Sequence, residues 1–465
     1  PTPNWLDDWS FKRGLLAVDL HQCLPDALTD WSWEWTSSLS LKDLKLSMGD
    51  AQSLANSSYL DELTALHLSR TDLDTSGART LASSKFRLNL VELDIAERAW
   101  EEGFLNLALS LPRLNSLRFF ATEAPTDAMI RLASSPTMTQ LSNLNLYRNT
   151  LSTRGAEAFA KAECSQLHTL RVGACRLGAS GVRALMKGTF ESLTSLNLSD
   201  DDFDEAGIAA LTQSKILGQL TALNLGFNRL SDEGIARLAD CERSSNLQDL
   251  SLYFTEFGVK GIESLARSPY LKNLRTLRLA YVKFQDQGVT ALANSSSMSN
   301  LQEVDLQGVQ CGDIGAEALA QSSTLSNLQD MSLYDNELTS RGAQALARSK
   351  CLTSLCGLSL DSNPIGDEGV EALASCQLSL RRLGLGNTGI SNRAVIALTQ
   401  SPAVEGLVYL SLGDNEITDE SVHALIESPY LKNLSQLYLR HTSLSSSAEQ
   451  ALRERFEPQG TKISL

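Results

Sequence analysis

Residues 220–246 read LTALNLGFNRLSDEGIARLADCERSSN, and this stretch holds the signals of a strand, a turn and a helix. Leu223 and Leu225 keep the two-residue period that sends both side chains to one face of a strand. Asn228 follows, at a place where a buried amide can bond the free backbone groups of a turn. Ser231 is a helix-capping residue, and two carboxylates that suit the helix dipole come directly after it. The next apolar residues recur at helical spacing. The stretch therefore predicts one strand–turn–helix unit.

The same unit returns along most of the chain, at intervals close to 27 residues. Its starting leucines are Leu41, Leu63, Leu90, Leu114, Leu141, Leu167, Leu193, Leu220, Leu247, Leu274, Leu301, Leu328, Leu355, Leu380, Leu407 and Leu434. A repeat of this length predicts a solenoid, in which each unit packs only against its neighbours. We expect three parts: a Trp-rich N-terminal capping unit over residues 1–40, sixteen repeats of about 26–27 residues over 41–456, and a C-terminal cap with an edge strand over 457–465.

This unit resembles the ribonuclease-inhibitor type of leucine-rich repeat, and the resemblance covers nearly all of residues 41–456. It implies an α/β solenoid, a horseshoe with a parallel β-sheet on its concave face and α-helices on its convex face. Adjacent strands pack about 4.8 Å apart and adjacent helices about 8–10 Å apart, so the stack must bend with the sheet inside. The asparagine slot of the family is filled in part, by Asn149, Asn228, Asn336, Asn363 and Asn415, whereas Arg98, Asp201, Val282 and Val309 depart from it.

The two ends of the chain carry weaker signals. Residues 9–15, WSFKRGL, resemble the stretch that leads into the repeats of bacterial repeat-companion leucine-rich-repeat proteins, which implies a small helical domain upstream and no established activity. We also expect a strand over residues 15–20, a helix over 24–35 and a final edge strand over 463–465.

Composition argues against several classes of ligand. The net charge is −15, which disfavours nucleic acid because binding to a phosphate backbone needs a basic stripe. No stretch approaches 18 apolar residues, so we expect no membrane span. The eight cysteines form no CxxC pair and there are five histidines, so we expect no metal and no cofactor, and we predict a reducing, cytoplasmic compartment.

No catalytic signature is present. The sequence lacks GxSxG, HExxH and a P-loop, and its histidines fall in different repeats. The acidic run Asp200–Asp202 lacks the glycine-containing loop of a calcium site, and we interpret it as a solvated turn. We therefore predict that the chain is not an enzyme.

Two groups of side chains are candidates for binding a partner. Phe227, Tyr253, Phe254 and Tyr281 come just past the strands of three consecutive repeats, with Arg278 beside them and Tyr334 farther along the same rim. Exposed aromatic residues next to arginine are typical binding anchors, although the rings could instead cover the loops of their own repeats. The second group is acidic, with Glu303, Asp305 and Asp330 at its centre. A basic partner would offset the repulsion between them, but acidic residues also cluster by chance in so acidic a chain.

The sequence thus predicts a non-catalytic scaffold that binds a protein partner on the concave face and rim of a horseshoe. Two alternatives stay open. Ran GTPase-activating proteins resemble this repeat type, but no loop arginine can be assigned to that activity, and the end Lys462-Ile463-Ser464-Leu465 is not the usual acidic tail. The sensor half of a larger NOD-like receptor is the other alternative.

Overall fold

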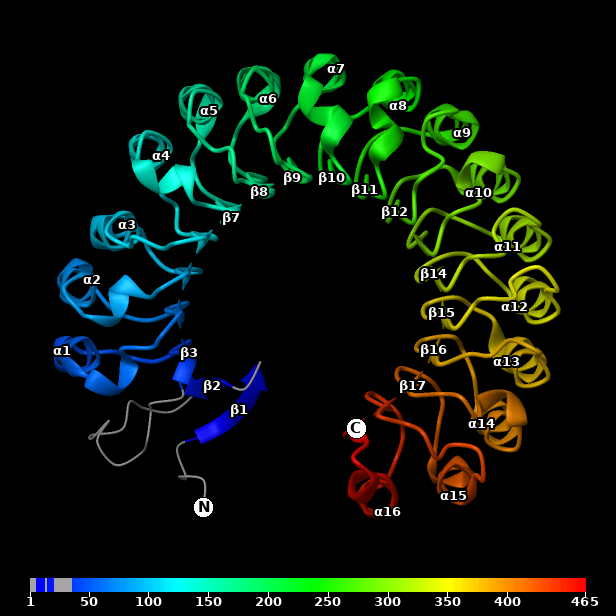
Figure 1. Ribbon diagram of the computed structural model, residues 1–465. Helices are drawn as coiled ribbons and strands as arrows, with labels where there is room; N and C mark the ends of the chain where they lie inside the picture. Colours follow the sequence, from blue (N-terminus) through cyan, green and yellow to red (C-terminus); the bar gives the residue numbers. More distant parts are fainter. Residues whose placement is uncertain (1–5, 13–14, 21–35) are drawn as a thin grey trace. The chain divides into compact units, whose positions relative to one another are not determined.

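The computed structural model describes residues 6–12, 15–20 and 36–465. The chain divides into two compact units, Pro1–Asn224 and Leu225–Leu465. Within each unit, successive strands lie side by side along one edge and the helices lie along the opposite edge (Figure 1). Each unit is thus a two-layered stack of strand–turn–helix repeats.

The first unit opens with an antiparallel hairpin and continues as a parallel sheet. Its strands are β1 (Leu6–Lys12), β2 (Leu15–Leu20), β3 (Thr36–Ser40), β4 (Ala65–His67), β5 (Glu92–Asp94), β6 (Ser116–Arg118), β7 (Asn143–Asn145), β8 (Thr169–Arg171), β9 (Ser195–Asn197) and β10 (Ala222–Asn224). Its helices are α1 (Met48–Asn56), α2 (Thr75–Ala82), α3 (Glu102–Leu109), α4 (Thr126–Ala133), α5 (Ser152–Ala160), α6 (Gly178–Leu185) and α7 (Glu205–Gln213).

The second unit pairs its strands in parallel from β11 to β19. These strands are β11 (Asp249–Ser251), β12 (Thr276–Arg278), β13 (Glu303–Asp305), β14 (Asp330–Ser332), β15 (Gly357–Ser359), β16 (Arg382–Gly384), β17 (Tyr409–Ser411), β18 (Gln436–Tyr438) and β19 (Lys462–Ser464). Its helices are α8 (Asp232–Ala239), α9 (Val259–Arg267), α10 (Gln285–Ala293), α11 (Asp313–Ala320), α12 (Ser340–Ala347), α13 (Gly366–Ala374), α14 (Asn392–Thr399), α15 (Asp419–Glu427) and α16 (Ser446–Phe456).

The strand of the first repeat lies earlier than the sequence suggested. In β3, Leu39 pairs with Leu66 of β4, so the repeat begins at Thr36 and the predicted start at Leu41 is wrong. In this register Leu41 corresponds to Leu68 of the next repeat. Both side chains are fully buried. The segment LSLKDLKL contains the leucine spacing twice, five residues apart, and only pairing with β4 selects the register.

The N-terminal capping unit is described only in part. The strand expected over residues 15–20 is β2, which pairs in parallel with β3 and antiparallel with β1. The predicted helix over residues 24–35 lies outside the described residues. At the other end, β19 pairs in parallel with β18, at the place expected for the final edge strand.

The core of each repeat comes from the leucines that define it. Leu223 in the first unit, and Leu225, Ile235 and Leu238 in the second, are at most 1% exposed. The repeat over residues 90–113 lacks the usual helix motif, yet α3 forms there because Phe104 and Leu105 supply the buried face instead. Burial of apolar side chains between strand and helix is therefore what each repeat has in common.

In several repeats a buried asparagine ties the turn to the repeat before it. The amide nitrogen of Asn363 donates to the carbonyl oxygens of Leu333 (2.8 Å), Leu360 (3.0 Å) and Asp361 (3.2 Å), while its amide oxygen accepts from the Leu338 amide (3.0 Å). Asn149, Asn336 and Asn415 make the same pattern. One side chain thus satisfies four buried backbone groups of two repeats.

Asp201 occupies the position that asparagine has in other repeats, and its carboxylate accepts the hydrogen bonds that the asparagine oxygen accepts there. Its Oδ1 accepts from the backbone amides of Cys175 (2.8 Å) and Leu177 (3.2 Å). The side chain is buried, so the interpretation of Asp200–Asp202 as a solvated turn is wrong for its middle residue. Burial raises the pKa of Asp201 to about 8, against the lowering effect of the two amides.

Carboxylates cap helices from one repeat to the next. Oδ1 of Asp286 accepts from the amides of Gly312 (2.7 Å) and Gly315 (2.8 Å), at the N-terminus of the following helix. Asp232, Asp313, Asp367 and Asp419 cap their following helices in the same way. Each of these five aspartates therefore serves the dipole of the neighbouring helix as well as that of its own.

Replacing Asn363 with alanine should destabilise the protein. The change removes the partner of one buried carbonyl (Leu360) and of one buried amide (Leu338), which costs on the order of 3 kcal/mol, whereas the Leu333 and Asp361 carbonyls each keep a second donor. Urea denaturation followed by circular dichroism measures this free energy. The control is Asn300→Ala, which removes an exposed amide that bonds one carbonyl (Lys272, 2.7 Å) and should cost less than about 1 kcal/mol. An equal loss of unfolding free energy in both variants would contradict the proposed stabilising role of the buried asparagine.

Asp201→Asn should change how stability depends on pH. Because the pKa of Asp201 is higher in the folded state (about 8) than its ordinary value of 3.8, its contribution to stability is fully present below 3.8 and is lost as pH rises toward 8. The variant does not titrate, so its stability relative to the wild type should increase over that range. Urea midpoints at pH 5, 6.5 and 8 measure it, with the exposed Glu191→Gln as control. A constant difference at all three pH values would refute the shifted pKa.

Candidate functional site

Each strand from β3 to β18 is followed by a turn residue in the left-handed backbone conformation. In the second unit these residues include Phe227 (φ 56°), Phe254 (φ 53°), Tyr281 (φ 59°) and Gly308 (φ 61°). We call this the rim position. The amide of each rim residue donates to the carbonyl that precedes the next rim residue, as in Phe227 to Tyr253 (2.9 Å). Rim side chains of successive repeats are therefore held side by side.

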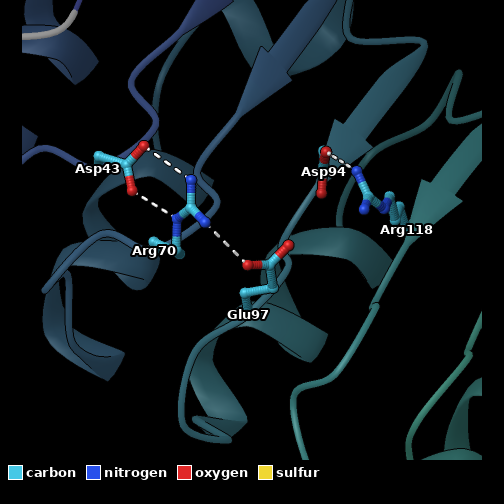
Figure 2. A network of polar contacts seen from close by, with 5 residues as sticks. All are labelled: Asp43, Arg70, Asp94, Glu97 and Arg118. Carbon is cyan, nitrogen blue, oxygen red and sulfur yellow. Dashed lines mark hydrogen bonds and ion pairs between the residues drawn. The ribbon is translucent and has the colours of Figure 1, made fainter. Parts of the chain in front are cut away.

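In the first unit the rim position carries an ion-pair ladder (Figure 2). Arg70 donates from Nε to Asp43 Oδ1 (2.5 Å), from Nη2 to Asp43 Oδ2 (2.9 Å) and from Nη1 to Glu97 Oε2 (3.0 Å). Asp43, Arg70 and Glu97 are rim residues of consecutive repeats, all with positive φ. Acidic and basic side chains thus both occur at the rim position, with the same left-handed backbone conformation.

In the second unit the same position carries stacked aromatic rings. Phe227 and Phe254 stack with centroids 4.5 Å apart and planes 6° apart, and Phe254 stacks on Tyr281 at 4.5 Å and 25°. Tyr253 meets Phe227 edge to face at 5.4 Å. We call Phe227, Phe254 and Tyr281 the rim stack. The structure thus brings together the four aromatic residues that the sequence singled out.

The rim stack is partly exposed, with Phe227 at 47% and Phe254 at 44%. It ends at Gly308, where an added Cβ would lie 2.5 Å from the Tyr281 ring. The Tyr281 hydroxyl accepts from Gln307 Nε2 (2.7 Å) and donates to Asp335 Oδ2 (3.2 Å). The rings therefore pack on one another across repeats and leave an apolar edge in solvent.

Tyr334 does not join the stack. It lies one residue before the rim position of its own repeat and is 37% exposed. Among the described residues its ring has no aromatic neighbour, so it forms a separate feature of the same rim.

Arg278 is engaged with carboxylates of the adjacent strands. Its Nη1 lies 3.0 Å from both carboxylate oxygens of Asp249 on β11, and its Nη2 lies 3.0 Å from Glu303 Oε1 on β13. As an anchor for a partner, Arg278 would have to give up these two ion pairs. Arg278 therefore links its own strand, β12, to β11 and β13 through side-chain ion pairs.

The acidic candidates border a hollow of about 470 Å³ on the strand face of the second unit. We call it the acidic hollow. Its carboxylates come from β13, β14 and the turn after β15, and its remaining polar residues include an arginine and a tyrosine: Glu303, Asp305, Asp330, Asp361, Arg382 and Tyr409. Burial raises the pKa of Asp305, against the lowering effects of the Gln307 amide and the Arg278 charge.

Two glycines shape the acidic hollow. Gly357 lies between Asp330 and Arg382 in strand register, and the two side chains form an ion pair above it. Gly384 leaves room for the Asp361 carboxylate, because a Cβ added at Gly384 would overlap that carboxylate. Sequence reasoning missed Arg382, Tyr409 and both glycines. The alignment of successive repeats could have revealed this ion pair. It places Asp330, Gly357 and Arg382 at the same position of three neighbouring strands, with the small residue between the opposite charges.

Two kinds of feature do not occur in the part of the chain that the structure describes: a metal-binding cluster and a membrane-spanning helix. There, no cluster of three or more His, Cys, Asp or Glu residues is arranged to hold a metal ion. Over the same residues, every helix is too short or too polar to cross a bilayer.

Arg278→Gln should destabilise the protein by about 1 kcal/mol, because two partly exposed carboxylates lose a shared guanidinium. Urea denaturation at low and at high salt measures the loss, which should shrink in 1 M NaCl. The matched control is Arg267→Gln, whose side chain is 76% exposed and forms an i,i+4 pair with Glu263 at 2.9 Å. That variant should change stability by less than about 0.5 kcal/mol. A loss that salt leaves unchanged would assign the Arg278 effect to packing.

Comparison with known proteins agrees with this architecture. The family model of the leucine-rich repeat matches residues 220–239, 351–374 and 407–425. No curated protein sequence matches the chain.

Among solved structures, the chain is similar to the yeast complex of Rad7 and Elc1, with 19% identity, a TM-score of 0.51, and coverage of 77% of this chain and 86% of that one. It also matches an internalin from Listeria monocytogenes (17% identity, TM-score 0.39, coverage 79% and 84%) and the mouse RP105/MD-1 complex (15%, 0.44, coverage 92% and 74%). The chain therefore carries leucine-rich repeats and has the fold of a leucine-rich-repeat solenoid.

Proposed function

We propose that this chain is a non-catalytic scaffold that binds a protein partner through the rim stack and the adjoining strand face of its second unit. The observation that carries the proposal is the rim stack itself. Three aromatic side chains lie against one another, partly in solvent, at a position where many other residues occur. Aromatic residues at exposed sites are typical anchors of protein interfaces.

The conformation of the rim position supports this proposal. Left-handed backbone is strained for a bulky side chain and is best tolerated by glycine, asparagine and aspartate. Other repeats of the second unit have smaller or polar residues at this position: Gly308, Asp335, Ser362, Asn387, Asp414 and His441. Aromatic residues at three consecutive repeats are therefore not what stability alone would select, and ring–ring contacts worth roughly 0.5–1.5 kcal/mol each offset only part of the cost.

The charge of the acidic hollow indicates the partner's chemistry. Four carboxylates line it, and the Arg382 guanidinium that lines it as well is paired with one of them, Asp330. A partner that presents apolar side chains to the rim stack and a lysine or arginine to the hollow would match both features. Nucleic acid and membranes are not part of the proposal.

We also propose that the repeats are of the ribonuclease-inhibitor type. A helix of eight or more residues in every repeat supports this subtype. The yeast structure of similar fold is a complex of two proteins, Rad7 and Elc1, which is consistent with a binding role. The cytoplasmic location and the likeness to bacterial repeat-companion proteins rest on the sequence alone.

The test is a pulldown from a lysate of the source organism, read by mass spectrometry, with the wild type and a Phe227→Asn/Phe254→Asn/Tyr281→Asn variant. Asparagine suits the left-handed conformation, so circular dichroism and melting should stay close to the wild type. The expected result is a partner captured by the wild type and lost, by at least about tenfold, from the variant.

The matched control is Ile314→Asn, which removes an apolar side chain that is 62% exposed on α11 of the same unit. This variant should keep the partner. Loss in both variants would indicate non-specific apolar capture, and retention by the rim-stack variant would refute the proposed site.

A further inference from the structure

Part of the strand face of the first unit, at β6 and β8, carries arginines in place of carboxylates. Arg118 on β6 and Arg171 on β8 occupy the same register position, with Asn145 of β7 between them. Two strand spacings separate their backbones by about 9–10 Å. Arg148 lies at the rim position between these repeats, exposed and with φ 60°. Three arginines thus come from three consecutive repeats, two from strands and one from the rim position between them.

Aromatic rings lie next to these arginines. Phe120 and Tyr147 stack with centroids 5.6 Å apart and planes 15° apart. The Arg118 guanidinium carbon lies 4.9 Å from the centroid of the Phe120 ring. We call Arg118, Phe120, Tyr147, Arg148 and Arg171 the basic face.

The charges of the basic face are only partly neutralised within the protein. Arg118 donates from Nη1 to Asp94 Oδ2 at 3.0 Å (Figure 2). For Arg148 and Arg171, both exposed, no ion pair occurs within residues 36–465. The chain has 55 acidic residues against 40 basic ones, so carboxylate partners are plentiful in it, yet both of these arginines are exposed and unpaired among the described residues.

We propose that the basic face binds an acidic protein segment, whose carboxylates pair with Arg148 and Arg171 while an apolar side chain packs against Phe120 and Tyr147. Guanidinium and carboxylate form short, charge-assisted hydrogen bonds, often two at once. Nucleic acid is the less favoured ligand because the chain as a whole carries a charge of −15, which repels a phosphate backbone at long range. This site is separate from the rim stack and does not depend on the function proposed for it.

The experiment selects displayed dodecapeptides on the full chain, from one library rich in Asp and Glu and one rich in Lys and Arg. The wild type should enrich acidic peptides that carry an apolar residue. Binding of a selected peptide, measured by fluorescence anisotropy, should weaken at least about tenfold in Arg148→Glu/Arg171→Glu, because two charge-assisted contacts become repulsive.

The control is Arg183→Glu/Lys187→Glu, which makes the same change in net charge at two exposed residues of α6 and the turn after it. It should leave binding within about twofold, since exposed charges far apart are screened. Equal weakening in both variants, or failure to select acidic peptides on the wild type, would overturn the proposal. So would a single-stranded oligothymidine that binds the wild type in place of the peptides. Melting curves confirm that both variants fold.

Discussion

The whole structure depends on hydrogen bonds that cross from each repeat to the next. From β4 to β19 each strand is only three residues long and cannot hold a sheet alone. Without further bonds, most of the turn groups between strand and helix would be buried without partners. Asn363 bonds the turn before it, and Asp286 caps the helix after it. Serines add a third line, as Ser268 Oγ donates to the Ala239 carbonyl of the preceding helix (2.6 Å). Each such bond contributes about 1 kcal/mol, but together they fix a single register.

A fixed register makes each position of the repeat into a row of neighbouring side chains. At the rim, where the backbone demands only a left-handed turn, the row is free to differ in chemistry. It carries charges at Asp43, Arg70 and Glu97, and rings at Phe227, Phe254 and Tyr281. Stability and recognition are thus divided between different positions of one repeat. The buried positions stay constant in type, and the rim and strand face carry what distinguishes one part of the chain from another.

Much of this could be predicted from period alone. Residues 27 apart occupy the same place in adjacent repeats, so the proximity of Phe227, Phe254 and Tyr281 follows from counting. Counting failed where the sequence offered two equal choices, since the leucines around Leu41 fit two frames and pairing with β4 chose the one that starts at Thr36. It also missed side chains that reach across a strand, because Arg382 meets Asp330 two strands away over Gly357.

The sequence by itself determined the repeat, its strand–turn–helix order, the residues of the core and which side chains share a row. These follow from periodicity, because burial and backbone hydrogen bonding repeat with the chain. Only the tertiary structure decided which members of a row are free and which are engaged. Arg278 is held by Asp249 and Glu303, and Asp201 is turned into the core, whereas Phe254 remains half in solvent. The reason is physical: a side chain's partners depend on distances of a few ångströms across neighbouring strands, and the pattern of residue types along the chain does not contain those distances.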